Sequence, residues 1–337
     1  MEMENPYVKQ FPELLKGKKM MYVHGFGSSG QSGTVTRLRT VFPNATVIAP
    51  DIPVHPQEAL ELLHRLCRDE HPDLIMGTSM GGMYTEQLYG FDRICINPAF
   101  KIGDTMVEHG LTGKQQFQNP RKDGVQEFYV DKAMVKEYRA ATELNFAHAD
   151  DPDEQHRVFG LFGDRDEVVD TFGIFPYRQG IPFHGEHRMN DHSFMHSVVP
   201  VIRWIDDRQE GRERPIVYIG TETLWQHDGE PRSSMQKAVR RLIERYQVLF
   251  VSFDMGTQNI INLKKQLEEY IGVPAWGHSI ITNQRHLLYG DYLVQGACGV
   301  RWPDHDPEPM ATPIELGSDT FKTWDDIIEY FDRLGGQ

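Results

Sequence analysis

The chain of 337 residues is long enough for about two domains, and its apolar content of 39% is sufficient for a core in each. Acidic residues outnumber basic ones by 49 to 35, for a formal net charge of −14. This charge argues against nucleic-acid or anionic-membrane partners, because both require basic patches.

The three cysteines are Cys67, Cys95 and Cys298, and they form neither a disulfide framework nor a zinc-ligand spacing. The N-terminal segment is acidic and polar, unlike a secretory signal, and no apolar run approaches the roughly 20 residues of a membrane span. We therefore expect a soluble protein in a reducing cytoplasm, without a membrane span.

Strand-like and helix-like segments alternate through the first half of the chain. The expected strands are 18–23, 45–49, 73–76, 91–96 and 157–162. The expected helices are 34–42, 56–69, the segment after Ser79, and 197–206. Such alternation predicts an α/β fold with a mostly parallel sheet and helices on both of its faces.

Residues from about 101 to 155 interrupt this rhythm, since they are polar and hold little β pattern. We expect them to form a helical insertion that covers the site as a lid. The charged run from Asp206 to Pro215 is the best domain boundary, which predicts domains at 1–211 and 212–337.

The second half also alternates. Its expected strands are 216–219, 248–253 and 278–282, and its expected helices are 235–246 and 262–271. A second, smaller α/β domain is therefore predicted.

The apolar run 73–76 leads into Gly77-Thr78-Ser79-Met80-Gly81, a Gly-x-Ser-x-Gly pattern. This pattern is typical of a nucleophile elbow, in which a serine occupies a strained turn between a strand and a helix. Ser79 is the candidate nucleophile, and the alternative is an ordinary glycine-rich turn.

The first strand ends in His24-Gly25-Phe26-Gly27. In a serine hydrolase with an elbow, the turn after an early strand and the residue after the nucleophile supply the N–H donors of the oxyanion hole. We assign these donors to the backbones of Phe26 and Met80, and give His24 a structural role.

The triad acid should follow the strand 157–162. Asp166 is the first choice, because Gly163-x-x-Asp166-x-x-Val169 has the spacing of an acid loop. Asp164 is the second choice and Asp170 is a further candidate.

The base should lie ahead of the last helix, where four histidines gather at positions 184, 187, 192 and 196. His192 is preferred because Met189 to Phe194 form a polar turn before that helix, and His187 is second. Four histidines also allow a metal site, but no His-Glu-x-x-His motif is present, and we expect neither a metal nor a cofactor.

Five ordered segments carry a family resemblance. They are His24-Gly25-Phe26-Gly27-Ser28-Ser29, Gly77-Thr78-Ser79-Met80-Gly81-Gly82, Ile96-Asn97-Pro98-Ala99, Gly163-Asp164-Arg165-Asp166-Glu167-Val168-Val169 and Asp191-His192-Ser193-Phe194. Over residues from about 19 to 206 the chain resembles the YqiA-like small esterases of the α/β-hydrolase superfamily. The resemblance implies cleavage of a small-molecule carboxylic ester or thioester, with Ser79, Asp166 and His192 as the triad.

Residues 270–274 and 280–294 resemble the C-terminal part of haloacid-dehalogenase-like 5′-nucleotidases. The resemblance implies an Asp-x-Asp pair after the first strand, where this chain has Gly220-Thr221-Glu222, and paired metal-binding aspartates where it has Gln295-Gly296. Arg285 falls where a phosphate-binding lysine is implied, and Ser252 matches the phosphate-binding Ser/Thr. Asp228 and Asp254 are the alternative nucleophiles.

The leading expectation is a serine hydrolase that acts through an acyl-Ser79 intermediate and carries a catalytically dead phosphatase-like domain. The alternatives are a non-catalytic binding or regulatory protein built from two degenerate enzyme folds, and a nucleotide phosphatase. A homo-oligomer is compatible with the sequence.

Overall fold

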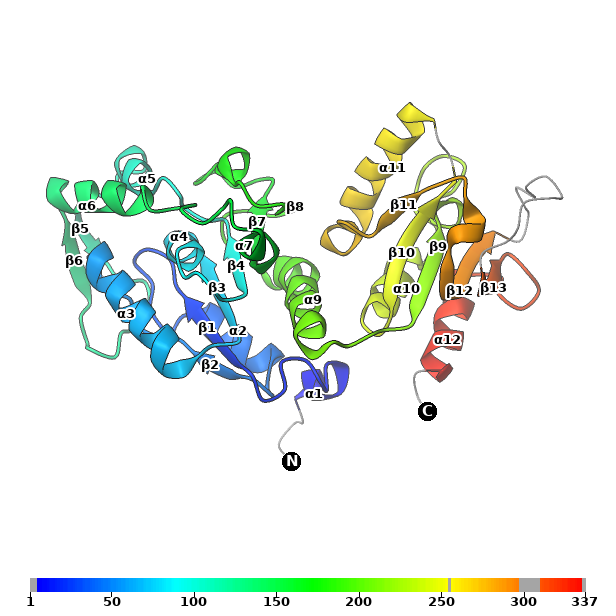
Figure 1. The fold of residues 1–337 in the computed structure, drawn as a ribbon, viewed down its shortest axis with the longest axis horizontal. Helices are drawn as coiled ribbons and strands as arrows, with labels where there is room; N and C mark the ends of the chain where they lie inside the picture. The colour runs from blue at the N-terminus through cyan, green and yellow to red at the C-terminus, as the bar shows by residue number, and fades with distance from the viewer. Residues whose placement is uncertain (1–4, 254–255, 297–309, 335–337) are drawn as a thin grey trace. The chain divides into compact units, whose positions relative to one another are not determined.

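The computed structural model describes residues 5–253, 256–296 and 310–334 (Figure 1). The chain divides into two units, Met1–Asp206 and Asp207–Gln337, where the sequence predicted a boundary at 211/212. Asp254 and Cys298 lie outside the described residues.

The first unit is built on a sheet of six strands in the order β2-β1-β3-β4-β7-β8, and every neighbouring pair is parallel. The strands are β1 (Lys19–Val23), β2 (Thr46–Ile48), β3 (Leu74–Thr78), β4 (Arg93–Ile96), β7 (Val158–Gly163) and β8 (Gln179–Phe183). All residues of β4 are buried, as expected for a central parallel strand covered on both faces. The α/β fold with a mostly parallel sheet is confirmed.

Helices lie before, between and after these strands. They are α1 (Pro6–Gln10), α2 (Gly33–Val41), α3 (Pro56–Glu70), α4 (Met80–Glu86), α8 (Asp191–Ser193) and α9 (Val199–Glu210), with a π-helical turn at Phe194–Val198. Ala59 and Leu63 of α3 and Met83 of α4 share one apolar cluster with Met21 and Ile75 of the sheet. This shared core places α3 and α4 on one face of the sheet. Ser79 alone separates the end of β3 from the start of α4.

The insertion contains α5 (Ile102–Glu108), α6 (Lys132–Thr142) and α7 (Pro152–Arg157). It also contains an antiparallel hairpin, β5 (Gly113–Gln116) and β6 (Glu127–Val130), where the sequence predicts a helical insertion. The reason is that β5 reads Gly-Lys-Gln-Gln and buries no residue, so it lacks the apolar alternation by which strands are recognised.

The second unit has a parallel five-stranded sheet in the order β11-β10-β9-β12-β13. Its strands are β9 (Ile216–Gly220), β10 (Gln247–Ser252), β11 (Ser279–Ile281), β12 (Tyr289–Gly296) and β13 (Met310–Leu316). Its helices are α10 (Met235–Ile243), α11 (Thr257–Tyr270) and α12 (Trp324–Leu334). The predicted second, smaller α/β domain is confirmed.

Among the described residues, none of the helices combines the length and the apolar character needed to cross a bilayer.

Candidate active site

Ser79 lies between β3 and α4 with φ 55° and ψ −122°, a backbone conformation that is strained for a residue with a side chain. Gly77 and Gly81 make this turn sterically feasible. A Cβ at Gly77 would overlap the Gly81 carbonyl, and a Cβ at Gly81 would overlap the Val23 carbonyl of β1. The tight turn presents the half-buried Ser79 hydroxyl at the carboxyl edge of the sheet.

His187 and Asp166 complete a chain of hydrogen bonds that begins at Ser79. The Nε2 atom of His187 lies 3.1 Å from Ser79 Oγ, and its Nδ1 atom lies 2.8 Å from Asp166 Oδ2. The three residues follow β3, β7 and β8. Because these strands are parallel, their carboxyl ends meet at one edge of the sheet, and residues more than 100 positions apart become neighbours.

The Asp166 carboxylate is held almost entirely away from solvent, with 3% of its side chain exposed. Its Oδ1 accepts hydrogen bonds from the backbone N–H groups of Val168 and Val169 at 2.8 and 2.9 Å. Burial alone raises the pKa of this carboxyl, but the hydrogen bonds from His187 and from the two amides outweigh burial and lower the pKa below its usual value. An ionised Asp166 is therefore favoured beside the His187 ring.

The structure does not bring His192, the histidine preferred from the sequence, to Ser79. His192 is exposed in the first turn of the closing helix, where its ring contacts His196 at a centroid distance of 4.3 Å. His187, the second choice, is the histidine that the structure places within hydrogen-bond distance of Ser79. The sequence favoured His192 because β8 has a weak strand signal: Gln179–Phe183 contains Gly and Pro, so the loop after it does not stand out.

The alternative acid, Asp164, makes a different pair. Its Oδ2 lies 2.8 Å from Nδ1 of the exposed His184. In the part of the chain that the structure describes, no group of three or more His, Cys, Asp or Glu side chains is arranged to hold a metal ion.

The turn after β1 packs directly against the nucleophile. A Cβ on Gly25 would lie 3.3 Å from the Ser79 Cβ and 3.9 Å from its Oγ, so only glycine leaves this approach open. Within the described residues, the N–H groups of Phe26 and Met80 donate to no other group of the protein. Both amides are therefore available to an oxyanion, and the Met80 N–H is one of the unpaired donors at the start of α4.

His24 holds this turn from behind. Its buried ring donates from Nδ1 to the Gly25 carbonyl at 2.8 Å, and its Nε2 accepts from the Ile52 N–H at 3.0 Å. Accepting at Nε2 requires a neutral ring, and burial lowers the pKa of His24 to about 4. The structural role expected for His24 has a physical basis in these two bonds.

Asn97 links the loops that carry the acid and the base, a role that the sequence analysis did not assign. Its Nδ2 donates to the carbonyls of Glu186 and His187 at 3.0 and 3.1 Å, and its Oδ1 accepts from the Gly163 N–H at 2.7 Å. The residue is buried and has a φ of 42°. Asparagine tolerates this left-handed conformation better than most residues. An asparagine directly after the strand 91–96 was therefore the feature of the sequence that could have indicated a special backbone position.

The fold and the three-residue hydrogen-bond chain define an α/β protein with the geometry of a serine hydrolase site. The profile of an uncharacterised protein family, UPF0227, matches residues 19–192, just over half of the chain. The chain belongs to this family.

Solved structures that are similar to part of this chain include three hydrolases. Est1E from Butyrivibrio proteoclasticus, solved with ferulic acid, is 13% identical over 60% of this chain and 92% of its own, with a TM-score of 0.38. The thioesterase domain of the curacin biosynthetic pathway is 12% identical over 56% and 90%, with a TM-score of 0.34. The methylesterase MES16 from Arabidopsis is 10% identical over 58% and 99%, with a TM-score of 0.31.

In the second unit, Glu222 folds back over Gly220, and its carboxylate fills the space that a side chain at position 220 would need. Glu222 also accepts a long hydrogen bond, 3.4 Å, from the Gly296 N–H. Arg285 donates to Gln295 at 3.2 Å, and Ser252 is buried at the end of β10. Asp228 is exposed in a turn, and the 3-10 helix Thr221–Thr223 separates this turn from the end of β9.

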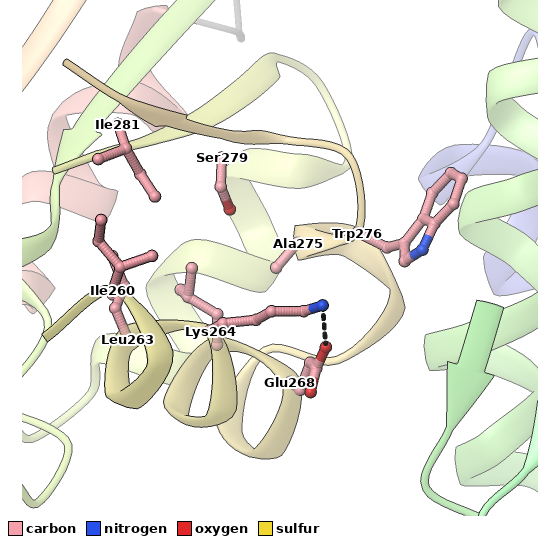
Figure 2. A pocket seen from close by; sticks show the side chains of 9 residues that line it. Ile260, Leu263, Lys264, Glu268, Ala275, Trp276, Ser279 and Ile281 are labelled. Atoms are coloured by element: carbon pink, nitrogen blue, oxygen red, sulfur yellow. Dashed lines mark ion pairs between the residues drawn. The ribbon is translucent and has the colours of Figure 1, made fainter. Parts of the chain in front are cut away.

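The second unit also contains a cavity of about 180 Å³ between α11 and β11 (Figure 2). Ile260, Ile281 and the stem of Lys264 line it, and Lys264 pairs with Glu268 at 3.8 Å. Its polar lining side chains are Ser279, Lys264 and Glu268. Lys264 pairs with Glu268, and within the described residues no hydrogen bond joins Ser279 to either, so the cavity holds no serine activated in the way that Ser79 is.

Proposed function

We propose that this protein is a serine hydrolase that cleaves a carboxylic ester or thioester through an acyl-Ser79 intermediate. In this proposal His187 Nε2 takes the Ser79 proton while Oγ attacks the carbonyl carbon. The N–H groups of Phe26 and Met80 stabilise the oxyanion, and Asp166 stabilises the His187 imidazolium.

The second half of the reaction uses the same groups. The tetrahedral intermediate collapses, and the alcohol or thiol leaves with the proton held by His187. A water molecule then gives a proton to His187 as it attacks the acyl carbon. When this second tetrahedral intermediate collapses, His187 returns that proton to Ser79 Oγ, and the carboxylic acid leaves as product.

The observation that carries the proposal is the unbroken pair of contacts from Ser79 through His187 to Asp166, at 3.1 and 2.8 Å. A non-catalytic binding protein has no need for a serine held in a strained conformation beside an imidazole that a buried carboxylate orients.

A panel of 4-nitrophenyl esters of increasing chain length tests the proposal. Wild-type protein should hydrolyse at least part of the panel, and Ser79→Ala should reduce kcat to the background rate without changing the urea midpoint. Turnover that survives in Ser79→Ala would rule out Ser79 as the nucleophile and reopen the binding-protein alternative.

For the second unit we propose a phosphatase-like domain without phosphatase activity. The support is chemical: Gly220 has no side chain to phosphorylate, and one carboxylate, Glu222, stands where the phosphatases require two aspartates. Release of phosphate from nucleotides in the presence of Mg²⁺, at rates above a heat-inactivated control, would overturn this assignment.

A further inference from the structure

Arg188 directly follows His187, so the residue next to the base carries a positive charge. Its side chain is exposed, and its Nη2 atom donates a hydrogen bond of 3.0 Å to Gln118 Oε1. Among the residues that the structure describes, no carboxylate lies within ion-pair distance of Arg188. Its only protein partner there is a neutral amide.

Gln118, the partner of that guanidinium, lies against the turn after β1. The Gln118 N–H donates to the Gly27 carbonyl at 2.7 Å, and its Nε2 lies 3.9 Å from the position of a Cβ on Gly27. Gly27 directly follows Phe26, an oxyanion donor in the proposed mechanism. The Arg188–Gln118 hydrogen bond therefore spans from the loop of the base to the turn of the oxyanion hole.

The loop that carries Gln118 is firmly anchored, so its position is set by the fold. Ser29 Oγ donates to the Pro120 carbonyl at 2.6 Å, and Arg121 Nη1 donates to the Ile52 carbonyl at 3.0 Å. The Lys122 N–H donates to Asp51 Oδ2 at 2.7 Å. These bonds tie the loop between β5 and β6 to the segments that follow β1 and β2.

Three carboxylates of the neighbouring loops are already paired. Asp166 accepts from His187, Asp164 lies against His184, and Asp191 pairs with Arg37 at 2.6 Å. In a chain with 49 acidic and 35 basic residues, an arginine without a carboxylate beside the nucleophile is a cation available to a ligand. A guanidinium presents a planar fork of donors that matches carboxylate and phosphate oxygens.

We propose that Arg188 and Gln118 form an anion-binding subsite beside Ser79, and that the natural substrate carries a carboxylate or phosphate group close to its scissile ester or thioester. The inference rests on the proposed function for the role of Ser79. Arg188 takes the anion, and the Gln118 amide holds the guanidinium in place and donates from Nε2.

Two esters with the same leaving group test the subsite: 4-nitrophenyl butyrate, which is neutral, and the mono-4-nitrophenyl ester of glutaric acid, which is anionic. The measured quantity is the ratio of their kcat/KM values. Arg188→Gln should lower the anionic-to-neutral ratio about tenfold, the effect of losing one charge-assisted contact, through KM of the anionic ester. Arg188→Lys should recover part of the ratio, and Gln118→Glu should lower it because a carboxylate then neutralises Arg188.

The matched control is Arg65→Gln, which removes an exposed arginine on α3 and changes the net charge equally. It should leave the ratio within twofold of wild type. An equal ratio in wild type, Arg188→Gln and Arg65→Gln would contradict a subsite for an anionic acyl group.

Calorimetry on Ser79→Ala separates this inference from the proposed function, because it requires no turnover. Glutarate and inorganic phosphate are titrated separately into Ser79→Ala and into Ser79→Ala/Arg188→Gln. Affinity lost with Arg188 for one of the two anions supports the subsite and identifies which anion it accepts. Equal affinity of both proteins for both anions overturns the subsite, whatever the ester assays show.

Discussion

Asn97 holds the loop of Asp166 and the loop of His187 together. The Asn97→Asp variant keeps the bond to the Asp166 side and removes the bonds to the His187 side. Aspartate keeps the size of the side chain, tolerates the φ of 42° and still accepts from the Gly163 N–H. It replaces the Nδ2 donor by an oxygen that faces the carbonyls of Glu186 and His187.

The magnitude follows from these contacts. Two hydrogen bonds of about 1 kcal/mol each are lost, and two carbonyls are left against a carboxylate oxygen, so a destabilisation of about 2–4 kcal/mol is expected. Because a displacement of about 1 Å at a reacting group costs on the order of 100-fold, kcat for ester hydrolysis should fall about 10- to 100-fold through misplacement of His187.

The assay is steady-state hydrolysis of 4-nitrophenyl butyrate, with urea unfolding of the same samples to establish that the variant is folded at the assay temperature. Asn44→Asp is the matched control, because Asn44 Nδ2 also donates to a backbone carbonyl, that of Pro12, at 3.1 Å. A folded Asn97→Asp protein whose kcat stays within twofold of wild type would refute the positioning role.

Three further predictions concern stability. The pKa of His24 is about 4 in the folded protein and about 6.5 when unfolded, so the free energy of unfolding should be constant above pH 6.5 and fall as pH drops toward 4, by roughly 2 kcal/mol at pH 5. Urea unfolding at pH 7 and pH 5 measures this, and His24→Asn should show a smaller difference. Gly81→Ala should destabilise by more than about 3 kcal/mol because its Cβ would overlap the Val23 carbonyl, whereas Gly33→Ala meets open space and should change stability by less than about 1 kcal/mol. Arg93→Met leaves Glu154 buried without its ion-pair partner and should lower the free energy of unfolding by about 3–5 kcal/mol. The double variant Arg93→Met/Glu154→Gln should lower it by less than Arg93→Met alone. Additive effects in this double-mutant cycle would contradict the pairing.

The sequence predicts the central strands and the nucleophile because those signals are local. The apolar run before Gly77 and the glycines around Ser79 specify a strand, a strained turn and a helix within a few residues. Asp166 is also close to a strand that can be recognised from its composition. For these two residues the local prediction and the three-dimensional geometry agree.

The contact between His187 and Ser79 could not be predicted in the same way, because it depends on an edge strand with a weak signal. Phe183 of β8 pairs with Gly163 of β7, and this register places His187 opposite the loop of Asp166. His192 lies closer in sequence to the last helix than His187 does. Contact with Ser79 depends instead on how the distant strands β3, β7 and β8 pair in the sheet. The β5–β6 hairpin escaped prediction for a related reason: β5 is polar and buries no residue, so its pairing with β6 leaves no apolar pattern in the β5 sequence.

The most direct test of the central claim is mass spectrometry of the protein after reaction with a fluorophosphonate, performed on wild type, Ser79→Ala, His187→Gln and His192→Gln. We expect one phosphonate on Ser79 in wild type and none in Ser79→Ala. Labelling should be slowed at least about 100-fold in His187→Gln and should stay within twofold of wild type in His192→Gln. An adduct on another residue, or loss of labelling in His192→Gln with His187→Gln unaffected, would contradict the claim.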